Sequence, residues 1–227
     1  MADNALSYRQ IAKMIDISAV QAPHGEQDIR ELVQVAQTYG FGAIHVLPAW
    51  VSFTRALLAG STEIALGAPV GFPSGGSHTL IKRAEAVQLV ADGVDEFDMM
   101  LNVGKLRSHD DAYVLDDLRA VISAVKVPAK VILETHYLND DEIRRACEMC
   151  IQAGAAFIKT STGWAETGAT IENITLIAEC VRGRIGIKAA GGIRDLDSLM
   201  HMYRLGVRRF GINVQAAVDI VQAARSH

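Results

Sequence analysis

The segment AFIKTSTG, residues 156–163, is an apolar run that ends in a lysine, Lys159, and passes at once into small hydroxylated residues and glycine. Such a run is typical of a buried parallel strand that opens onto a polar loop. Burial removes water from an ammonium group and favours the neutral amine, which is the form that attacks a carbonyl to give a Schiff base. Lys159 is therefore a candidate nucleophile. The alternative for a single lysine at a strand end is that it extends to solvent or forms an ion pair.

A second lysine repeats this pattern 29 residues later. The segment RIGIKAAGG, residues 184–192, places Lys188 at a strand end before a glycine pair. The interval is one strand–helix–strand unit, so the two strands are expected to be neighbours in a parallel sheet, about 4.8 Å apart. At that spacing each positive charge is expected to lower the pKa of the other amine. The two lysines together predict a reactive amine.

Short β-branched runs alternate with amphipathic segments of helical length along the whole chain. We expect strands at residues 13–17, 42–47, 64–70, 96–101, 130–134 and 208–212, besides those that end at Lys159 and Lys188. We expect helices at residues 6–12, 26–39, 110–124 and 215–225, after Pro48 and Gly75-Gly76, and from Asn139, Thr170 and Asp195.

Eight strand–helix units in one domain, residues 1–227, predict an α/β protein with a closed (β/α)8 TIM barrel and a short N-terminal helix. Chemistry in such barrels takes place at the C-terminal ends of the strands, where both lysines lie. An open doubly wound sheet is the alternative. It is disfavoured because no glycine-rich dinucleotide fingerprint follows an early strand.

The fourth expected strand supplies a candidate acid. With a period of two, Glu96, Asp98, Met100 and Asn102 share one face. If that face is the barrel interior, Asp98 lies near the lysines, stays ionised, and accepts and returns protons directly or through a water. The alternative for Asp98 is a structural counter-ion.

Other strand ends complete a candidate site. The first strand ends at Asp16-Ile17-Ser18, where Asp16 and Ser18 are suited to orient a substrate hydroxyl. Lys130 and Glu134 have the same parity and are expected to form a charged layer inside the barrel, because burying one without the other is costly. Gly191-Gly192 with Arg194 is a candidate phosphate site, although a glycine pair is also a common turn.

Composition restricts the function further. Half of the 227 residues are apolar, the net charge is −4, and no basic run appears, so we expect a small ligand and no nucleic acid. No stretch of 18 apolar residues occurs and residues 1–6 lack the features of a signal peptide, so we expect no membrane association and a cytoplasmic location.

Cys147 and Cys150 match CxxC spacing but lie within an expected helix, so we expect them to pack in the core. The seven histidines show no HxH or HExxH spacing, so we expect no metal and no cofactor.

With these residues assembled, the chain resembles the deoxyribose-phosphate aldolase family of class I aldolases over residues 15–211. The resemblance implies that Lys159 is the Schiff-base lysine, that Lys188 lowers its pKa and that Asp98 belongs to the proton relay. It also implies a (β/α)8 barrel that needs no metal and forms a homodimer. The implied reaction is that of a lyase of carbohydrate degradation, which reversibly cleaves 2-deoxy-D-ribose 5-phosphate to acetaldehyde and D-glyceraldehyde 3-phosphate. The matching motifs are Gly71-Phe72-Pro73, Asp95-Glu96-Phe97-Asp98, residues 130–135, residues 157–163 and residues 188–194. The expected substrate contacts are Asp16, Ser18, Thr162, Gly163, Gly191, Gly192, Arg194, Gly211 and Asn213.

One departure leaves the substrate open. Where the family carries serines that help to hold the phosphate, this chain has Gly211-Ile212-Asn213-Val214. A related aldolase for a non-phosphorylated or different aldehyde is therefore an alternative. A barrel that binds a sugar phosphate without turnover is a third, which the retention of Lys159, Lys188 and Asp98 disfavours.

Overall fold

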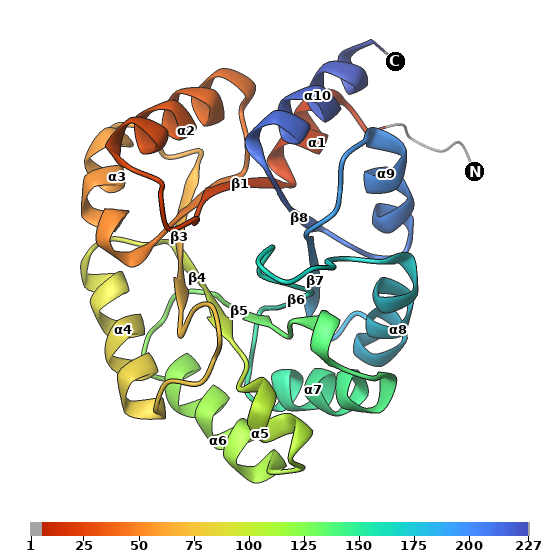
Figure 1. Ribbon diagram of the computed structural model, residues 1–227. Coiled ribbons are helices and arrows are strands. Elements are labelled where there is room, and N and C mark those ends of the chain that lie inside the picture. The colour runs from red at the N-terminus through yellow and green to blue at the C-terminus, as the bar shows by residue number, and fades with distance from the viewer. Residues whose placement is uncertain (1–5, 227) are drawn as a thin grey trace.

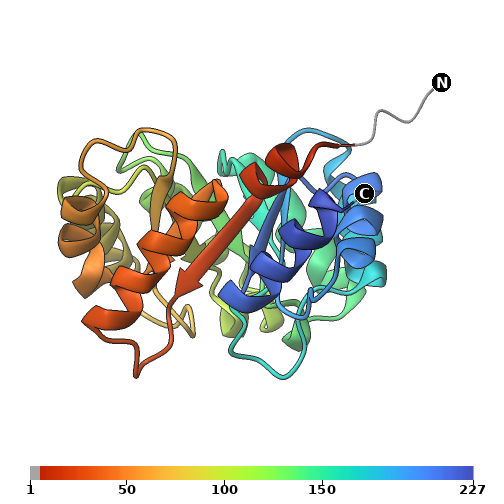
Figure 2. The same cartoon turned by 90° about the horizontal axis from the view of Figure 1, so that it is seen from above.

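The computed structural model describes residues 6–226, and these form eight parallel strands that close into a barrel in sequence order. Residues 1–5, on which the expectation of no leader partly depends, lie outside the described part. Figure 1 looks down the barrel and shows the helices as an outer ring around the strands, and Figure 2 shows the same arrangement from the side. The predicted (β/α)8 barrel with a short N-terminal helix is confirmed.

The strands of the barrel are short. They are β1 (Ile15–Ala19), β2 (Ala43–Val46), β3 (Ala65–Val70), β4 (Glu96–Met100), β5 (Ala129–Ile132), β6 (Phe157–Lys159), β7 (Gly186–Ala190) and β8 (Arg209–Ile212). The α-helices are α1 (Tyr8–Lys13), α2 (Glu26–Tyr39), α3 (Val51–Leu57), α4 (Thr79–Ala91), α5 (Val103–Arg107), α6 (Asp111–Ile122), α7 (Asp140–Gln152), α8 (Ile171–Val181), α9 (Leu196–Arg204) and α10 (Val214–Arg225). Two 3₁₀ turns, η1 (Pro48–Trp50) and η2 (Thr135–Tyr137), follow β2 and β5.

Helix boundaries follow capping chemistry in the sequence. Asn139 begins α7 by accepting from the backbone N–H of Glu142, whose own side chain accepts from the Asn139 N–H, so both orphan donors are satisfied. Thr170 and Asp195 accept in the same way at the starts of α8 and α9. At the other end of a helix, Gly40 stops α2 in a left-handed conformation with φ +73°.

The register of β6 against β7 sets two amines side by side. Lys159 pairs with Lys188 across these parallel strands. Parallel pairing directs paired side chains to the same side of a sheet, so both lysines project together. Lys159 is the last residue of β6, whereas Lys188 lies in the middle of β7, which continues to Ala190 beyond the strand end expected from the sequence. In the same sheet Asp98 of β4 pairs with Lys130 of β5. The register expected from the 29-residue interval is confirmed.

Several boundary predictions need correction. The first strand begins at Ile15 rather than residue 13, because α1 continues through Lys13. The fourth strand ends at Met100, and Asn102 leaves the inner face to cap α5, a short helix that was not predicted.

The predicted layer of Lys130 with Glu134 is wrong. The strand β5 ends at Ile132, and Glu134 adopts a left-handed backbone with φ +56° before η2. This conformation removes Glu134 from the alternation of β5, and its carboxylate instead accepts hydrogen bonds from the backbone and the hydroxyl of Thr162. Lys130 is fully buried and lies 2.7 Å from Glu96 and 3.2 Å from Asp98.

The apolar core fills the space between the barrel and its helices. Cys147 and Cys150 are buried there on α7, as predicted, and burial raises the pKa of both thiols, so both stay protonated. Across residues 6–226, none of the helices combines the length and the apolar character needed to cross a membrane.

Candidate active site

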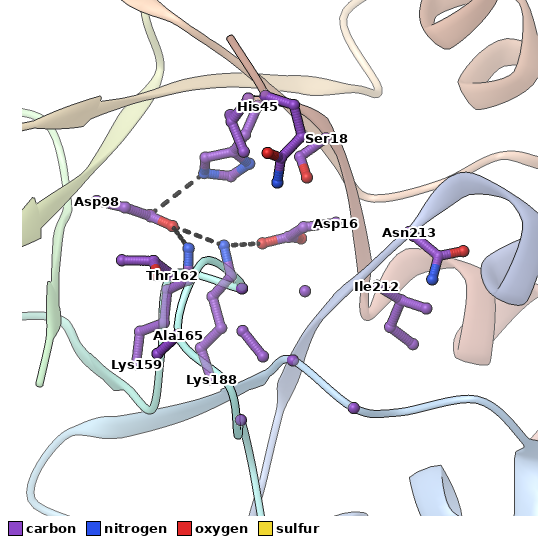
Figure 3. A pocket seen from close by; sticks show the side chains of 18 of the residues that line it. Asp16, Ser18, His45, Asp98, Lys159, Thr162, Ala165, Lys188, Ile212 and Asn213 are labelled. Carbon is purple, nitrogen blue, oxygen red and sulfur yellow. Dashed lines mark hydrogen bonds and ion pairs between the residues drawn. The ribbon is translucent and has the colours of Figure 1, made fainter. Parts of the chain in front are cut away.

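A cavity of about 600 Å³ lies at the carboxyl ends of the strands and contains every predicted site residue. Figure 3 shows its centre, where the lysines and two aspartates point toward one another. The residues brought together from the sequence prediction are Asp16, Ser18, Asp98, Lys159, Thr162, Gly163, Lys188, Gly191, Gly192, Arg194, Gly211 and Asn213. They come from five strands and the loops that follow them, so the closed barrel is what joins them.

Asp98 occupies the middle of the group. Its Oδ2 lies 2.8 Å from Lys159 Nζ and 2.9 Å from Lys188 Nζ, so one carboxylate oxygen bridges the two amines (Figure 3). Its Oδ1 lies 3.2 Å from His45 Nε2 and 3.2 Å from Lys130 Nζ. Burial alone would raise the pKa of Asp98, but His45 and the three lysines hold it well below its ordinary value. Asp98 is therefore ionised at neutral pH.

The pKa values of the two lysines shift in opposite directions. Burial lowers the pKa of Lys159, and the neighbouring Lys188 lowers it further, against the opposing effect of Asp98. Burial also acts on Lys188, but Asp16, Asp98 and Glu96 outweigh it and raise the pKa of Lys188. The sequence-based expectation that each lysine lowers the pKa of the other thus holds for Lys159 and is wrong for Lys188. The reason is that Lys188 faces an additional carboxylate, Asp16, at 2.7 Å.

The surrounding ion pairs balance when Lys159 is neutral. Three carboxylates, of Asp16, Glu96 and Asp98, meet four basic side chains through ion pairs of 2.7–3.2 Å; the basic groups are Lys130, Lys159, Lys188 and Arg209. With all four charged the group carries one excess positive charge, and with Lys159 neutral it carries none. An uncompensated charge away from water is costly, so the network favours loss of the proton from Lys159, in the same direction as burial and Lys188 shift its pKa.

Two members of this network were not identified from the sequence. Arg209 on β8 lies 2.7 Å from Asp16 and 2.9 Å from Glu96. His45 on β2 is 4% exposed and contacts Asp98. Each is a polar residue within a short run expected to be a buried strand, and that was the available signal. Which carboxylate it would contact depends on strands distant in the sequence.

Asp16 and Ser18 both line the cavity from β1 and its carboxyl end. Asp16 is 1% exposed, and its two oxygens are held by Lys188 and Arg209. Its observed contacts are those of a group that fixes Lys188. Ser18 is half-buried at the cavity wall, so the predicted contact with a substrate hydroxyl belongs more naturally to this residue.

The loops after β6 and β7 pack against each other through glycines. Gly191 and Gly192 have φ of +83° and +85°, and a Cβ on Gly191 would lie 2.9 Å from Ser161 Oγ and 3.0 Å from Gly168 Cα. Only glycine fits this close approach without strain. The loop therefore exposes backbone to the cavity, beside the exposed side chain of Arg194.

The segment at β8 ends where it was predicted to end. Gly211 and Ile212 belong to the strand, as expected from the strand predicted at residues 208–212. The side-chain oxygen of Asn213 accepts from the backbone N–H of Ala216 at 3.0 Å and caps α10. This oxygen is thus occupied, and the amide nitrogen is the part of the side chain left to meet a ligand.

An aromatic pair lies beside the cavity. Phe72, which lines it, contacts Trp164 edge to face, with ring centroids 5.4 Å apart. Trp164 is 43% exposed and follows directly on Gly163. Neither ring was identified as part of the site from the sequence, although Phe72 follows the carboxyl end of β3 by two residues.

A metal site is not favoured by the charges. Asp16, His45 and Glu96 offer ligand atoms within 4.8 Å of one another. Both carboxylates already pair with Lys or Arg side chains, whose positive charges would repel a cation. That the reaction needs no metal stays a prediction.

Curated proteins and solved structures named as aldolases are similar to this chain over most of its length. A family model described as DeoC/LacD family aldolase matches residues 10–208. Deoxyribose-phosphate aldolase of Sinorhizobium medicae is 52% identical over 219 residues, covering 96% of this chain and 88% of the relative. The enzyme of that name from Klebsiella pneumoniae subsp. pneumoniae is 49% identical over 221 residues, covering 96% and 89%. A structure described as a putative deoxyribose-phosphate aldolase from Coccidioides immitis has a TM-score of 0.92 at 35% identity, covering 97% of this chain and 88% of that one. A tetrameric deoxyribose phosphate aldolase from Aeropyrum pernix has a TM-score of 0.88 at 26% identity, covering 98% and 94%.

Proposed function

The chain belongs to the DeoC/LacD aldolase family, and from this membership we propose that it is a class I aldolase that reversibly cleaves 2-deoxy-D-ribose 5-phosphate to acetaldehyde and D-glyceraldehyde 3-phosphate. The observation that carries the proposal is the pairing of Lys159 and Lys188 on one oxygen of Asp98 inside the cavity. A neutral amine, a cation and an ionised acid at hydrogen-bonding distance are the groups that Schiff-base chemistry requires.

Lys159 acts as the nucleophile. Its neutral Nζ attacks the C1 aldehyde of the open-chain sugar, and uptake of one proton from solvent with loss of water gives a protonated imine; hydrolysis of the imine at the end of the cycle releases that proton again. Asp98, directly or through a water, takes the proton of the C3 hydroxyl. The C2–C3 bond then breaks, and its electron pair moves to the imine and forms an enamine, while C3 becomes the aldehyde of glyceraldehyde 3-phosphate.

The return of that proton completes the cycle. Asp98 delivers it to the former C2 carbon, directly or through the same water, which regenerates the imine of acetaldehyde. Hydrolysis then frees acetaldehyde and the amine, so protons and water balance over one turnover. Lys188 remains charged throughout, held by Asp16 and Asp98.

Bond cleavage neutralises two opposite charges inside the site. The iminium nitrogen gains the electron pair of the C2–C3 bond, and Asp98 takes up the proton of the C3 hydroxyl. The net charge of the network is unchanged, while the positive centre on Lys159 and the negative charge of the carboxylate beside it disappear together.

We assign the rest of the cavity to substrate binding. The backbone of Gly191 and Gly192, with Arg194, is positioned for the phosphate. Ser18 meets a substrate hydroxyl, and Gly211 leaves room beside Lys188, whose Cε would lie 3.5 Å from a Cβ there. The remaining proposed contacts are Thr162, Gly163 and Asn213.

Borohydride trapping tests the nucleophile. Wild-type protein incubated with acetaldehyde and borohydride should gain one ethyl group at Lys159, located by peptide mass spectrometry. Lys159→Leu should lose both the adduct and measurable turnover, because leucine cannot form an imine. A wild-type protein without the adduct, or a Lys159→Leu variant that turns over normally, would refute the proposed function.

A second candidate is an aldolase for an acceptor without phosphate. It is favoured by the wall near β8, where Ile212 is apolar and the oxygen of Asn213 is used in capping, and by the carboxylate of Glu166 in the cavity lining. The test compares kcat/KM for 2-deoxyribose with and without its 5-phosphate. We expect at least a tenfold preference for the phosphate ester from its charged contacts, about 1.4 kcal/mol or more. Equal values would establish the second candidate.

Assembly and location are proposed from the sequence. We propose a single aldolase domain over residues 1–227 and a homodimer in the cytoplasm, although one related structure is tetrameric. Light scattering coupled to size-exclusion chromatography distinguishes a dimer from a monomer or tetramer, given a chain mass of 24.5 kDa.

A further inference from the structure

His45 is the buried titratable residue in the cavity for which the mechanism has no step. It lies on β2, is 4% exposed, and lines the cavity on the opposite side of Asp98 from Lys159 (Figure 3). Its Nε2 contacts Asp98 Oδ1 at 3.2 Å and lies 3.7 Å from Glu96. The role of this ring beside Asp98 is inferred on the basis of the proposed aldolase function.

The neighbouring strand provides space for the ring. Gly67 on β3 pairs in register with His45. A Cβ on Gly67 would lie 2.6 Å from Cδ2 and 2.8 Å from Cε1 of the imidazole, and closer still to Nε2. Any other residue at this position would displace the ring or its own strand. The absence of a side chain at Gly67 thus leaves the space that the imidazole of His45 occupies beside Asp98.

The ring is held neutral and in one tautomer. Burial lowers the pKa of His45, with Lys188 and Lys130 acting in the same direction and Asp98 opposing them. Since the carboxylate of Asp98 is ionised, the nitrogen facing it must be the N–H donor. Nδ1 is then an acceptor, and within residues 6–226 it has no hydrogen-bond partner.

The bond from His45 differs from the other contact to the same oxygen. Lys130 also lies 3.2 Å from Asp98 Oδ1, but its closer partner is Glu96 at 2.7 Å. An ammonium attracts a carboxylate from many directions, whereas an imidazole N–H bonds along one direction in the ring plane. The ring therefore restricts the rotation of Asp98 more than the lysine does.

We propose that His45 is a positioning residue whose imidazole, seated over Gly67, fixes Asp98 in the orientation needed for proton transfer. With Oδ1 held by the ring, Oδ2 faces Lys159 and Lys188 and exchanges protons with the substrate carbon and hydroxyl. Removal of the ring leaves Lys159 able to form an imine but slows the proton transfers that follow.

Two measurements separate these steps. Borohydride trapping with acetaldehyde reports the imine on Lys159. Exchange of the methyl protons of acetaldehyde for deuterium, followed by NMR in D2O, reports proton transfer at the carbon that becomes C2. We expect His45→Leu to keep trapping within about twofold and to lower exchange and kcat by roughly ten- to a hundredfold, the usual cost of losing a group that orients a catalytic side chain.

A conservative variant and a control sharpen the result. His45→Gln retains an N–H donor near the position of Nε2 and should recover at least a third of the wild-type exchange rate. His201→Leu makes the same change at an exposed position on α9 and should leave all rates unchanged. Circular dichroism and urea unfolding identify variants that are not folded.

A double-mutant cycle tests the complementarity and does not depend on His45→Leu folding well. Gly67→Ala alone should slow exchange as much as His45→Ala, because the new methyl group displaces the ring. In a His45→Ala background the same change should cost less than twofold, because the space is then free.

The proposal is overturned if His45→Leu exchanges at the wild-type rate, if trapping falls as much as exchange, or if Gly67→Ala costs the same in both backgrounds. Absence of any adduct on the wild-type protein would instead overturn the aldolase function, and this proposal with it. The two failures are therefore distinguishable.

Discussion

Lys188 is 1% exposed and charged, and its charge acts on the residue beside it. Two carboxylates, Asp16 and Asp98, lie within 2.9 Å of its Nζ and stabilise the ammonium. The ammonium in turn helps burial to lower the pKa of Lys159. One lysine therefore adds to the effect of burial on the other, and the asymmetry arises from Asp16, which contacts Lys188.

Replacement of Lys188 by methionine should shift the pH dependence of imine formation. Without the ammonium the pKa of Lys159 rises, so the neutral amine, which exists above that pKa, appears at higher pH. The rate of borohydride trapping, measured from pH 6 to 10, should move its rising limb to higher pH.

Lys188→Arg is the matched control, since it retains the charge and should retain most of the wild-type profile. An unchanged profile in Lys188→Met would show that burial alone sets the pKa of Lys159.

At the scale of single elements, the residues that cap helices differ in whether they also line the cavity. Asn213 caps α10 and also lines the cavity, so one residue serves both. Asn139 caps α7 through a reciprocal pair of bonds with Glu142 and is not part of the cavity lining. Changes at these two caps are therefore expected to have different consequences.

Asn139→Ala should lower the free energy of unfolding by about 1 kcal/mol and leave kcat and KM unchanged. The loss arises because the first N–H groups of α7 lose their acceptor. Urea unfolding followed by circular dichroism measures it.

Asn173→Ala provides the comparison, because Asn173 lies inside α8, where alanine has the higher helix propensity and no destabilisation is expected. An Asn139→Ala variant as stable as wild type would show that the cap contributes nothing.

At the scale of the whole molecule, one buried charge network joins the strands across the barrel. Arg209 of β8 bonds carboxylates of β1 and β4, and Lys188 of β7 bonds carboxylates of the same two strands. The charged groups that make the site reactive thus also connect strands far apart in the sequence. Loss of the anionic partners should therefore weaken the barrel as a unit.

Acid should destabilise the fold through these carboxylates. Burial opposes ionisation, but the facing cations lower the pKa of Asp16, Glu96 and Asp98 below their ordinary values of 3.8 for Asp and 4.5 for Glu. A group with a lowered folded-state pKa stabilises the protein above the unfolded value, and this stabilisation is lost as the pH falls toward the folded value.

We expect the free energy of unfolding to fall first below about pH 6.5, because burial lowers the pKa of His45 and the unfolded chain then binds a proton that the folded protein does not. It should fall more steeply below about pH 4.5, where the unfolded chain also protonates the three carboxylates. Urea unfolding at pH 7, 5, 4 and 3 measures this. A free energy of unfolding that is constant down to pH 3 would contradict the role of the network.

Much of the architecture is predictable from local pattern. Lys159 and Lys188 stand at the ends of apolar runs one strand–helix–strand unit apart, and the eightfold alternation implies a barrel that joins their carboxyl ends. The inward position of Asp98 is also predictable, because side chains alternate between the two faces along β4. Glu134 does not follow, because a left-handed residue breaks the alternation, and such a residue is not marked by its own sequence.

The amino-acid order alone thus determined the eightfold strand–helix alternation and the candidate nucleophile, because these depend on periodicity and on neighbours three or four residues away. Only the closed barrel decided which lysine has the lowered pKa, since that depends on Asp16 contacting Lys188 from β1. The same is true of His45, whose place beside Asp98 requires the glycine on β3. Charge interactions act through space over a few ångströms, and distances of that size between distant residues exist only once the chain has closed on itself.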